Sequence, residues 1–591
     1  MNVSDFIISR LADWKIEKIF GYPGDGINGL LGALNRNGSV RFIQVRHEEM
    51  AAFMACGHAK FTGEVGVCMA TSGPGAIHLL NGLYDAKLDH QPVVAIVGQQ
   101  KGTSLGSSYQ QEVDLLSLFK DVAGEYVQMI NNPTQARQVI DRAFRIAKAE
   151  RTVTAVIIPN DIQEDPAVEQ PGRMHGNVVT GTGHSKSHVI PDDNELLHAA
   201  EILNSGEKVA ILVGAGAFGA EKEIMEAADL LGAGVAKALL GKAVIPDDLP
   251  YVTGSIGMLG TKASWELMDG CDTLLMIGSS FPYAEYLPEP GKARGVQVDI
   301  DGKMLSIRYP MEVNLLGSSK DTLQKLLPML KYKQDRSWRM EIEQHVMDWW
   351  QTVEDRANLP ADPLNPQLVI QRLSPLLPDH CILTADSGTS AFWYARNIKL
   401  RAGMMASLSG NLATMCPSVP YAIAAKFAYP DRLPVAITGD GAMQMLGMNE
   451  LITICKYWKQ WAHPGLVIIV LNNRDLNMVT WEQRMLAGEP KFEGSQDIPD
   501  VDYAAYARLL GLSGIRIDQP EQIDGALAEV LSADRPALLD VVCDPNVPII
   551  PPHIDKATLV KFSKAMLKGD PDSAQVIRQT IRQVMQGGSS F

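Results

Sequence analysis

Cysteines that could form a disulfide framework or a zinc site are missing from this 591-residue sequence. The seven cysteines are odd in number and lie far apart, and no C-x-x-C pair occurs among them. Isolated thiols of this kind are typical of a reducing compartment. The sequence therefore predicts a cytoplasmic protein without disulfides.

Long apolar runs are also scarce. The longest, at 466–471, has the length of one buried strand, whereas a membrane-spanning helix needs about 20 apolar residues. Residues 1–20 include Asp5, Asp13 and Glu17 and lack both the basic head and the apolar run of a secretion signal. We therefore expect them to form the first helix of a domain, and we expect no transmembrane segment.

Positive charge is in the minority, with 53 Lys and Arg against 68 Asp and Glu and a net charge of −15. Duplex binding draws most of its affinity from cations that neutralise phosphates, so nucleic acid is not an expected partner. An anionic ligand would have to be bound by helix ends, glycine loops or a metal ion. The content of 46% apolar and 20% charged residues is that of an ordinary globular protein, and the length predicts three or four domains.

Two stretches divide the chain. Glu164 to Asn194 is rich in Pro, Gly, His and Ser without periodicity, which predicts a linker, and 357–366 contains prolines that stop a helix. The predicted domains are 1–163, 190–330 and 364–550, followed by a tail at 551–591. Short β-branched runs alternate with amphipathic segments of helix length in each domain. The predicted fold class is therefore α/β, with three open, mostly parallel-sheet domains and helices on both faces.

A possible cation site follows two strands of the third domain. The motif Gly439-Asp440-Gly441 comes directly after the predicted strand 434–438, and Asn472-Asn473 ends the strand 466–471. Because parallel strands end at one edge of a sheet, Asp440 and Asn473 should lie together. Oxygen ligands there suit a hard cation, Mg²⁺ or Ca²⁺, that holds a diphosphate, and the helix after Gly441 adds amide donors. A GDG motif alone could equally be an ordinary strand-to-helix turn.

The GDG…NN pairing resembles the thiamine diphosphate motif of the pyruvate oxidase and acetohydroxyacid synthase family, and the resemblance extends over nearly the whole chain. It implies that Mg²⁺ is held by Asp440, Asn473 and the backbone carbonyl of Asp475. It also implies that Gly439, Gly441 and Ala442 contact the cofactor. The 30 residues between Gly441 and Asn472 exceed the usual family spacing, and we expect the extra residues near 456–465.

The first domain resembles the pyrimidine-binding domain of the same family. The text RHEEMAA at 46–52 places Glu48 as the glutamate that hydrogen-bonds the aminopyrimidine and favours its imino tautomer. Glu49 is an equally good candidate on the residues alone, until the motif sets the register. The resemblance further implies cofactor contacts from loops after two strands: Pro23, Gly24, Asp25, Ser72 and Gly73.

The segment 410–425 of the third domain resembles the family segment that binds the pyrimidine ring. Met415 is expected to be the bulky residue that forces the bent cofactor shape, and the carbonyl of Ala413 is expected to accept the 4′-amino group. Cys416 stands where the family usually has glycine, a change from one small residue to another whose cost should be modest.

The central domain contains a G-x-G-x-x-G motif at 214–219, after a strand and before a helix. A dinucleotide site would need an acidic residue at the end of the next strand, which instead ends in Gly241-Lys242. With 237–242, 254–260 and 278–286, the domain resembles the FAD-binding domain of pyruvate oxidases, although some family members bind ADP or no flavin. The residues implied are Gly214, Gly216, Lys242, Ser279, Ser280, Phe281, Asp299 and Asp301.

The family resemblance implies a small 2-oxo acid substrate, most simply pyruvate. We expect oxidative decarboxylation through an enamine oxidised by FAD, because 21–30, 78–90 and 551–572 look like pyruvate oxidases and quinone-linked pyruvate dehydrogenases. The residues implied in catalysis are Glu48, Gln111, Met415, Val479 and Glu482. Gln110 stands where oxidases usually carry Phe, so the pocket could accept a more polar substrate.

Two other functions remain open. One is a non-oxidative carboligase or decarboxylase such as acetolactate synthase, with flavin absent or structural. The other is a nucleotide-binding assembly protein that keeps the fold without the chemistry. The resemblance also implies a homodimer or homotetramer, with the Glu48 domain of one subunit facing the Asp440 domain of another. A helical period at 576–585 predicts that the tail packs on its own subunit, and membrane docking is the alternative.

Overall fold

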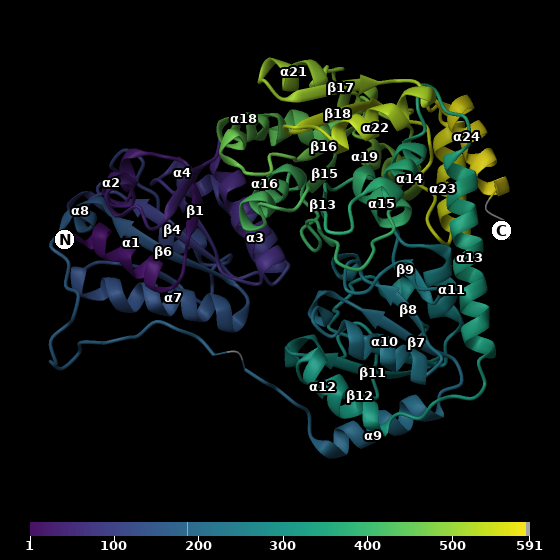
Figure 1. The fold of residues 1–591 in the computed structure, drawn as a ribbon, viewed down its shortest axis with the longest axis horizontal. Coiled ribbons are helices and arrows are strands. Elements are labelled where there is room, and N and C mark those ends of the chain that lie inside the picture. The colour runs from purple at the N-terminus through teal and green to yellow at the C-terminus, as the bar shows by residue number, and fades with distance from the viewer. Residues whose placement is uncertain (186, 587–591) are drawn as a thin grey trace.

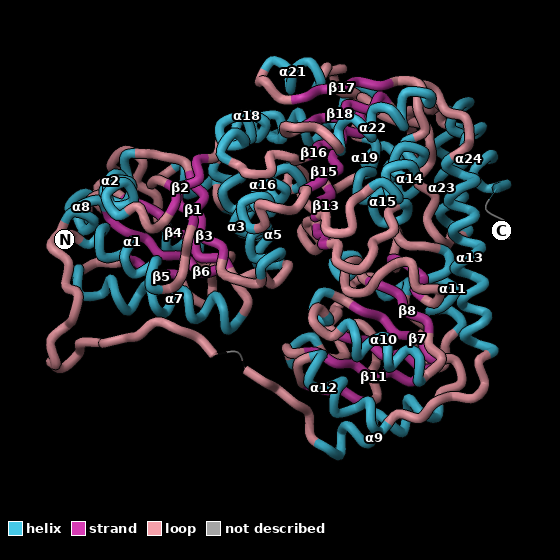
Figure 2. Tube along the Cα trace, in the orientation of Figure 1, coloured by secondary structure: helices cyan, strands magenta, loops and turns pink. Residues whose placement is uncertain are grey.

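The computed structural model describes residues 1–185 and 187–586 and contains three six-stranded sheets with parallel strand pairs. Helices surround each sheet, as Figure 1 and Figure 2 show. The α/β class predicted from the sequence is therefore confirmed.

The first sheet has the strand order β2-β1-β3-β4-β6-β5. Its strands are β1 Lys18–Gly21, β2 Arg41–Gln44, β3 Gly66–Ala70, β4 Val93–Gln99, β5 Val127–Met129 and β6 Val153–Pro159. Its helices are α1 Val3–Asp13, α2 Asn28–Asn37, α3 Glu48–Thr62, α4 Pro74–His78, α5 Leu80–Leu88, α6 Leu115–Phe119, α7 Ala136–Glu150 and α8 Asn160–Glu164. Every residue of β3, β4 and β6 is buried, as expected for parallel strands covered on both faces.

The central sheet has a different order, β12-β11-β10-β7-β8-β9. Its strands are β7 Val209–Val213, β8 Gly234–Lys237, β9 Val252–Ser255, β10 Thr273–Ile277, β11 Arg294–Asp299 and β12 Val313–Leu316. Its helices are α9 Asp193–Ser205, α10 Glu221–Leu230, α11 Lys262–Gly270, α12 Ser319–Leu326 and the long α13 Ser337–Ala357. This is the doubly wound order, in which all strands are parallel and the strand order reverses between β7 and β10.

The third sheet has the order β14-β13-β15-β16-β18-β17. Its strands are β13 Ile382–Ala385, β14 Met405–Ser407, β15 Pro434–Gly439, β16 Val467–Asn472, β17 Ser513–Ile517 and β18 Ala537–Val542. Its helices are α14 Pro366–Leu376, α15 Thr389–Asn397, α16 Ser418–Ala428, α17 Asp440–Ala442, α18 Met448–Tyr457, α19 Asn477–Glu482, α20 Glu493–Gln496, α21 Tyr503–Leu509 and α22 Ile523–Leu531. Numbered from their own first strands, the first and third sheets share the order 2-1-3-4-6-5.

The first and third domains are joined through packed helices. Helix α3 of the first domain packs along α16 of the third, and Cys56 on α3 lies 3.3 Å from the hydroxyl of Tyr421 on α16. A buried ion pair completes the joint, because Lys60 on α3 contacts Asp89 at 2.6 Å. Asp89 in turn accepts hydrogen bonds from the backbone amides of Gly410 and Asn411.

A long connection links the first and central domains. Between α8 and α9 its described residues form no helix and only one isolated bridge, between Pro166 and Asn2, and Figure 1 shows the connection crossing the lower side of the molecule. The tail forms α23 Lys556–Leu567 and α24 Ser573–Gln586. Helix α24 packs on α13 of the same chain, where Arg356 donates to the carbonyl of Gln583 at 3.2 Å.

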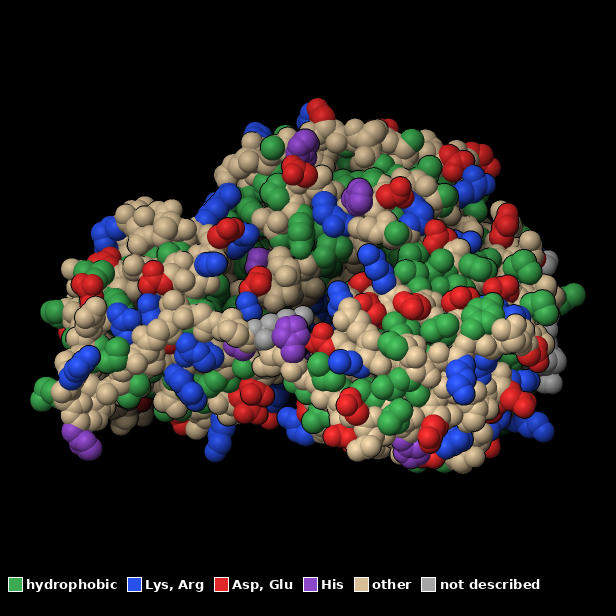
Figure 3. All heavy atoms as spheres, turned by 60° about the horizontal axis from the view of Figure 1, so that its bottom comes forward, with side chains coloured by type: hydrophobic (Ala, Val, Ile, Leu, Met, Phe, Trp, Pro, Cys, Tyr) green, Lys and Arg blue, Asp and Glu red, His purple; other side chains and the backbone are tan. Residues whose placement is uncertain are grey.

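The surface is mixed in charge. On the face drawn in Figure 3, Lys and Arg side chains are interspersed with Asp and Glu side chains. None of the helices in the described part of the chain combines the length and apolarity needed to cross a membrane.

Candidate active site

The candidate site lies where the strand order of the first and third sheets reverses. In both sheets the first strand lies between the second strand and the third strand. Open α/β sheets bind ligands at the carboxyl ends of the strands at such a reversal. In the first sheet this edge follows β1 and β3, and in the third sheet it follows β13 and β15.

Asp440 begins α17 at the carboxyl end of β15 and is almost fully buried. Its carboxylate accepts hydrogen bonds from the backbone amides of Gly441, at 2.9 Å, and Arg474. Burial raises the pKa of Asp440 to about 7, against the lowering effect of these amides. A buried carboxylate that is costly to ionise alone is suited to a divalent cation.

The other two predicted metal ligands lie beside Asp440. Asn473 follows β16 directly, and its side-chain oxygen accepts from the backbone amide of Asp475 at 3.1 Å. The carboxylate of Asp475 is occupied by Thr480 at 2.8 Å and Asn477 at 2.9 Å. The side chain of Asp475 thus holds the loop in shape, and only its backbone carbonyl is suited to a ligand role.

The two glycines of the GDG motif differ in the free space around them, and only Gly439 leaves room for a ligand. A Cβ added at Gly439 would meet no atom within 4 Å. A Cβ at Gly441 would lie 2.8 Å from Leu476 and 3.2 Å from the methyl group of Met415. Ala442 is buried, and its carbonyl accepts a hydrogen bond from the thiol of Cys416 at 3.4 Å. The structure therefore brings Met415, expected at the pyrimidine, next to the residues expected at the diphosphate.

A buried aspartate shapes the segment around Met415. Ala413 and Cys416 both have left-handed backbone conformations, with φ of 51° and 81°. Asp386 accepts hydrogen bonds from the amide of Cys416 at 2.9 Å and the hydroxyl of Ser418 at 2.7 Å. Burial raises the pKa of Asp386 to about 6. Asp386 is not among the residues predicted from the sequence, although it follows β13 as Asp440 follows β15, and the strand-end motif ADSG could have revealed it.

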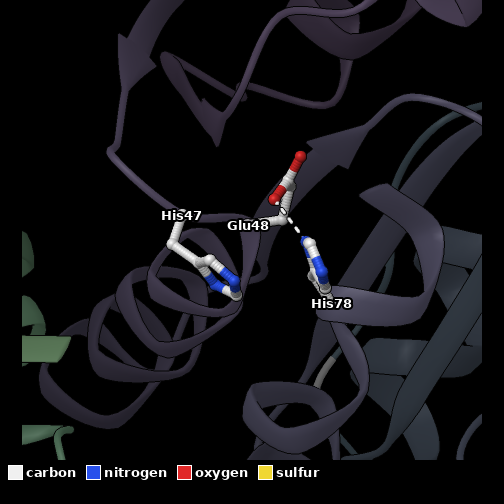
Figure 4. A group of neighbouring side chains, drawn as sticks. All are labelled: His47, Glu48 and His78. Atoms are coloured by element: carbon white, nitrogen blue, oxygen red, sulfur yellow. Dashed lines mark hydrogen bonds and ion pairs between the residues drawn. The ribbon is translucent and has the colours of Figure 1, made fainter. Parts of the chain in front are cut away.

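Glu48 is the first residue of α3 and is largely buried. Figure 4 shows its carboxylate beside the ring of His78, whose Nδ1 lies 3.0 Å from Oε2 of Glu48. The ring of His47, which caps α3, stacks on that of His78 with a centroid distance of 4.4 Å. Neither histidine is among the residues predicted from the sequence, because their side chains come together only through the fold.

The two candidate glutamates have different surroundings. Glu49 accepts a hydrogen bond from Asn81 at 2.7 Å, and Asn81 also donates to Thr414 at 3.0 Å. Glu49 thus faces the third domain of its own chain, whereas Glu48 faces His78. Within the described residues, Glu48 forms no hydrogen bond with the Asp440 side of the site.

The predicted loop residues of the first domain gather at the edge after β1 and β3. Gly24 cannot carry a side chain, because a Cβ there would lie 2.5 Å from that of Thr71. Gly73 has a φ of 62°, and its Cβ would lie 2.9 Å from the side chain of Gln111. Pro23 and Asp25 flank Gly24, and Ser72 is fully buried and bonded to Gln100 at 3.3 Å. Gln111 thus lies at the edge where the cofactor loops meet.

Val479 and Glu482 lie together on α19 and line a cavity of about 550 Å³. Its other lining residues are Gln483, Leu486, Ala487 and Glu489. Burial raises the pKa of Glu482. The structure therefore places both predicted residues on one hollow, beside α23 of the tail.

The glycine motif of the central domain packs against the end of β10. A Cβ at Gly214 would lie 2.4 Å from the carbonyl oxygen of Gly278, and one at Gly216 would lie 2.8 Å from its Cα. Ser279 and Phe281 follow this strand end and are buried, and Ser280 lies between them. These residues form the edge at which a doubly wound sheet binds a nucleotide.

The charged residues predicted for this edge divide into two groups. Lys242 is buried in an ion pair with Asp247 at 3.0 Å, and Lys237 binds the same carboxylate. Asp299 ends β11, where burial raises its pKa, and it accepts from the amide of Asp301 at 2.9 Å. Asp299 and Asp301 therefore lie at the edge, while the ammonium of Lys242 is enclosed by protein. The residues at this edge fit a nucleotide.

Comparison with known proteins agrees with this geometry. Residues 1–118 match the N-terminal TPP binding domain of thiamine pyrophosphate enzymes, residues 196–326 match the central domain, and residues 386–541 match the C-terminal TPP binding domain. The chain therefore belongs to the thiamine pyrophosphate enzymes, in the branch that includes pyruvate oxidases and acetolactate synthases.

Full-length relatives carry several names. The chain is 35% identical to YdaP of Bacillus subtilis, which carries the name of a thiamine pyrophosphate-containing protein, over 94% of each chain. It is 30% identical to the acetolactate synthase isozyme 2 large subunit of Escherichia coli, over 95% of this chain and all of that one. It is 28% identical to the pyruvate oxidase of Lactiplantibacillus plantarum, over 93% and 90%.

Proposed function

We propose that this protein uses thiamine diphosphate, Mg²⁺ and FAD for the oxidative decarboxylation of a small 2-oxo acid, most simply pyruvate. The observation that carries the thiamine part is the meeting of Asp440 and Asn473 at the reversal of the third sheet. When bound, the cofactor supplies a nucleophilic carbon and an electron sink for the loss of CO₂.

The residues divide this work between two domains. Asp440, Asn473 and the carbonyl of Asp475 would hold Mg²⁺ and, through it, the diphosphate. Glu48 would exchange a proton with the aminopyrimidine. Met415 would hold the two rings of the cofactor in a bent arrangement, and the place of its methyl group, 3.2 Å from where a Cβ of Gly441 would be, supports that position.

Separate observations support the oxidative step. The glycine edge of the central sheet and Asp299 support a nucleotide there, and the pyruvate oxidase relative supports FAD. The acetolactate synthase relatives, at equal or higher identity, favour a second candidate, a carboligase that joins two 2-oxo acids.

An absorption spectrum combined with mass analysis of the released cofactors tests the proposal. We expect a yellow protein that releases FAD and thiamine diphosphate and whose flavin bleaches when pyruvate is added anaerobically. Acetolactate formation by a colourless protein would establish the second candidate instead. Thiamine diphosphate missing from both the purified and the reconstituted protein would overturn both.

We also propose a homodimeric or homotetrameric protein of the cytoplasm, with each site shared between two subunits. The separation of Glu48 and Asp440 on different domains supports the shared site. The free cysteines among the described residues support a reducing location.

A further inference from the structure

The group formed by His47, Glu48 and His78 contains more ionisable side chains than the proposed function uses. Each offers a ligand atom within 4.8 Å of the other two. His47 and Glu48 are consecutive at the start of α3, and His78 ends the short helix α4. Figure 4 shows that the two rings face each other and that only His78 is bonded to the carboxylate.

The geometry argues against a shared metal ion. The two imidazole rings are stacked at 4.4 Å with an interplanar angle of 28°. Since the lone pair of an imidazole nitrogen lies in the ring plane, nearly parallel rings direct their lone pairs side by side. His47 also uses Nδ1 to accept a hydrogen bond from the backbone amide of Glu49 at 3.2 Å. The pair of rings is therefore not arranged as a chelate.

The lowered pKa of His47 indicates that this ring positions His78 and does not itself carry the proton. Burial and the neighbouring His78 lower the pKa of His47. A neutral His47 with Nδ1 as an acceptor can hold His78 by stacking without competing for the carboxylate of Glu48. His78 contacts the ionisable side chains of Glu48 and His47, and the charge of Glu49 acts on His47.

Exposure changes sharply across the Glu48–His78 contact. The side chain of Glu48 is 10% exposed, whereas that of His78 is 44% exposed. These fractions are those of the single chain, in which Nδ1 of His78 connects the carboxylate of Glu48 with the exposed side of the pair. Imidazole is the side chain best suited to proton exchange, because its charge changes near neutral pH.

We propose that His78 is the proton-exchange partner of Glu48, a role that rests on the proposed function. With the cofactor bound, Glu48 would give its proton to the pyrimidine nitrogen, so that an O–H bond would break as an N–H bond forms. Nδ1–H of the protonated His78 then breaks as the carboxyl O–H is restored. The neutral imidazole regains its proton from buffer, so that charge and protons balance.

The test measures exchange of the thiazolium C2 proton for deuterium on bound thiamine diphosphate, by acid quench and NMR, without substrate. His78→Asn keeps an amide donor near the position of Nδ1 but cannot carry a proton at neutral pH. We expect exchange at least ~10-fold slower in His78→Asn, with cofactor affinity within about twofold because the hydrogen bond remains. His78→Ala should be slow and should recover with added imidazole.

A matched control is His198→Asn, since His198 faces Glu312 at 3.7 Å on the surface of the central domain. It should exchange at the wild-type rate. Wild-type exchange in His78→Asn, or no recovery of His78→Ala with imidazole, would overturn the role of His78 alone. Failure of the wild type to bind thiamine diphosphate in calorimetry would overturn the proposed function and this inference together.

Discussion

Backbone strain is concentrated on either side of Met415. Ala413 and Cys416 both adopt left-handed conformations, which cost a residue with a Cβ about 1–2 kcal/mol each. Asp386 offsets part of this cost at Cys416 by accepting its amide hydrogen. The segment that presents Met415 is thus supported at Cys416 by Asp386, which directly follows β13.

This strain leads to a prediction at Cys416. Cys416→Gly relieves the left-handed backbone but removes a buried sulfur, so we expect its free energy of unfolding to stay within about 1 kcal/mol of wild type. Cys416→Val adds a β-branched side chain at the same φ and should cost at least ~2 kcal/mol. Urea unfolding of the apoprotein measures both. Equal free energies of unfolding for the two variants would contradict backbone strain at Cys416.

A second residue prediction concerns Asp440 and pH. Its folded pKa of about 7 lies above the ordinary value of 3.8, so the folded apoprotein binds a proton that the unfolded chain has lost. Stability contributed by this proton is present at low pH and is lost as pH rises through 7. We expect Asp440→Asn to stabilise the apoprotein at pH 8 by a few kcal/mol and to abolish Mg²⁺-dependent binding of thiamine diphosphate.

Thermal unfolding at pH 6 and pH 8, with and without Mg²⁺ and cofactor, measures both effects. The buried Glu450, with a pKa raised to about 7, contributes in the same direction, so the difference between variant and wild type isolates Asp440. Asp524→Asn, at an exposed aspartate paired with Arg372, should change neither property. If Asp440→Asn bound the cofactor with wild-type affinity, a role of Asp440 as a metal ligand would be contradicted.

At the scale of the elements, helix α3 places a predicted catalytic residue at one end and a contact between domains at the other. Its first residue is Glu48, and near its last turn Lys60 donates to Asp89 and to the carbonyl of Leu408. The segment that begins at Leu408 leads to Met415. The helix therefore connects the predicted proton-exchanging acid with the support of the pyrimidine segment.

Breaking this joint should be costly. Asp89→Asn removes the carboxylate that contacts the buried ammonium of Lys60 and leaves only the charge of Asp85 acting on it, and we expect a loss of about 3–5 kcal/mol in the free energy of unfolding. Lys60→Met combined with Asp89→Asn should recover part of the loss. The exposed pair of Lys148 and Glu64, at 2.6 Å, is the control, and Glu64→Gln should change stability by less than ~1 kcal/mol. A small effect of Asp89→Asn would show that the joint relies on apolar packing.

At the scale of the whole molecule, the shared site makes a quantitative prediction. Glu48→Gln and Asp440→Asn should each be inactive alone. If the two halves of a site come from different subunits, each mixed dimer contains one intact site, and random reassociation should restore about a quarter of wild-type activity. Activity assays after co-expression measure this. No recovery in mixed dimers that are shown to form would place both halves of the site in one chain.

Much of the architecture could be predicted from local patterns. The positions of Asp440 and Asn473 followed from their places after two buried strands, because parallel strands end at the same edge. The sequence also predicted the linker at 164–194 and the lack of an acidic residue after the second strand of the central domain, although that strand, β8, ends at Lys237 and not at the predicted Gly241-Lys242. Such features depend on neighbours in the sequence.

Other features depend on contacts between distant segments. The burial of Lys242 against Asp247, the support of Cys416 by Asp386 and the pairing of His78 with Glu48 have no local signature. By itself the sequence determined the α/β class and which residues follow which strands, since hydrophobic periodicity and glycine turns act locally. Only the tertiary structure decided which of those side chains meet, because packing between helices and sheets sets the distances on which hydrogen bonds and ion pairs depend.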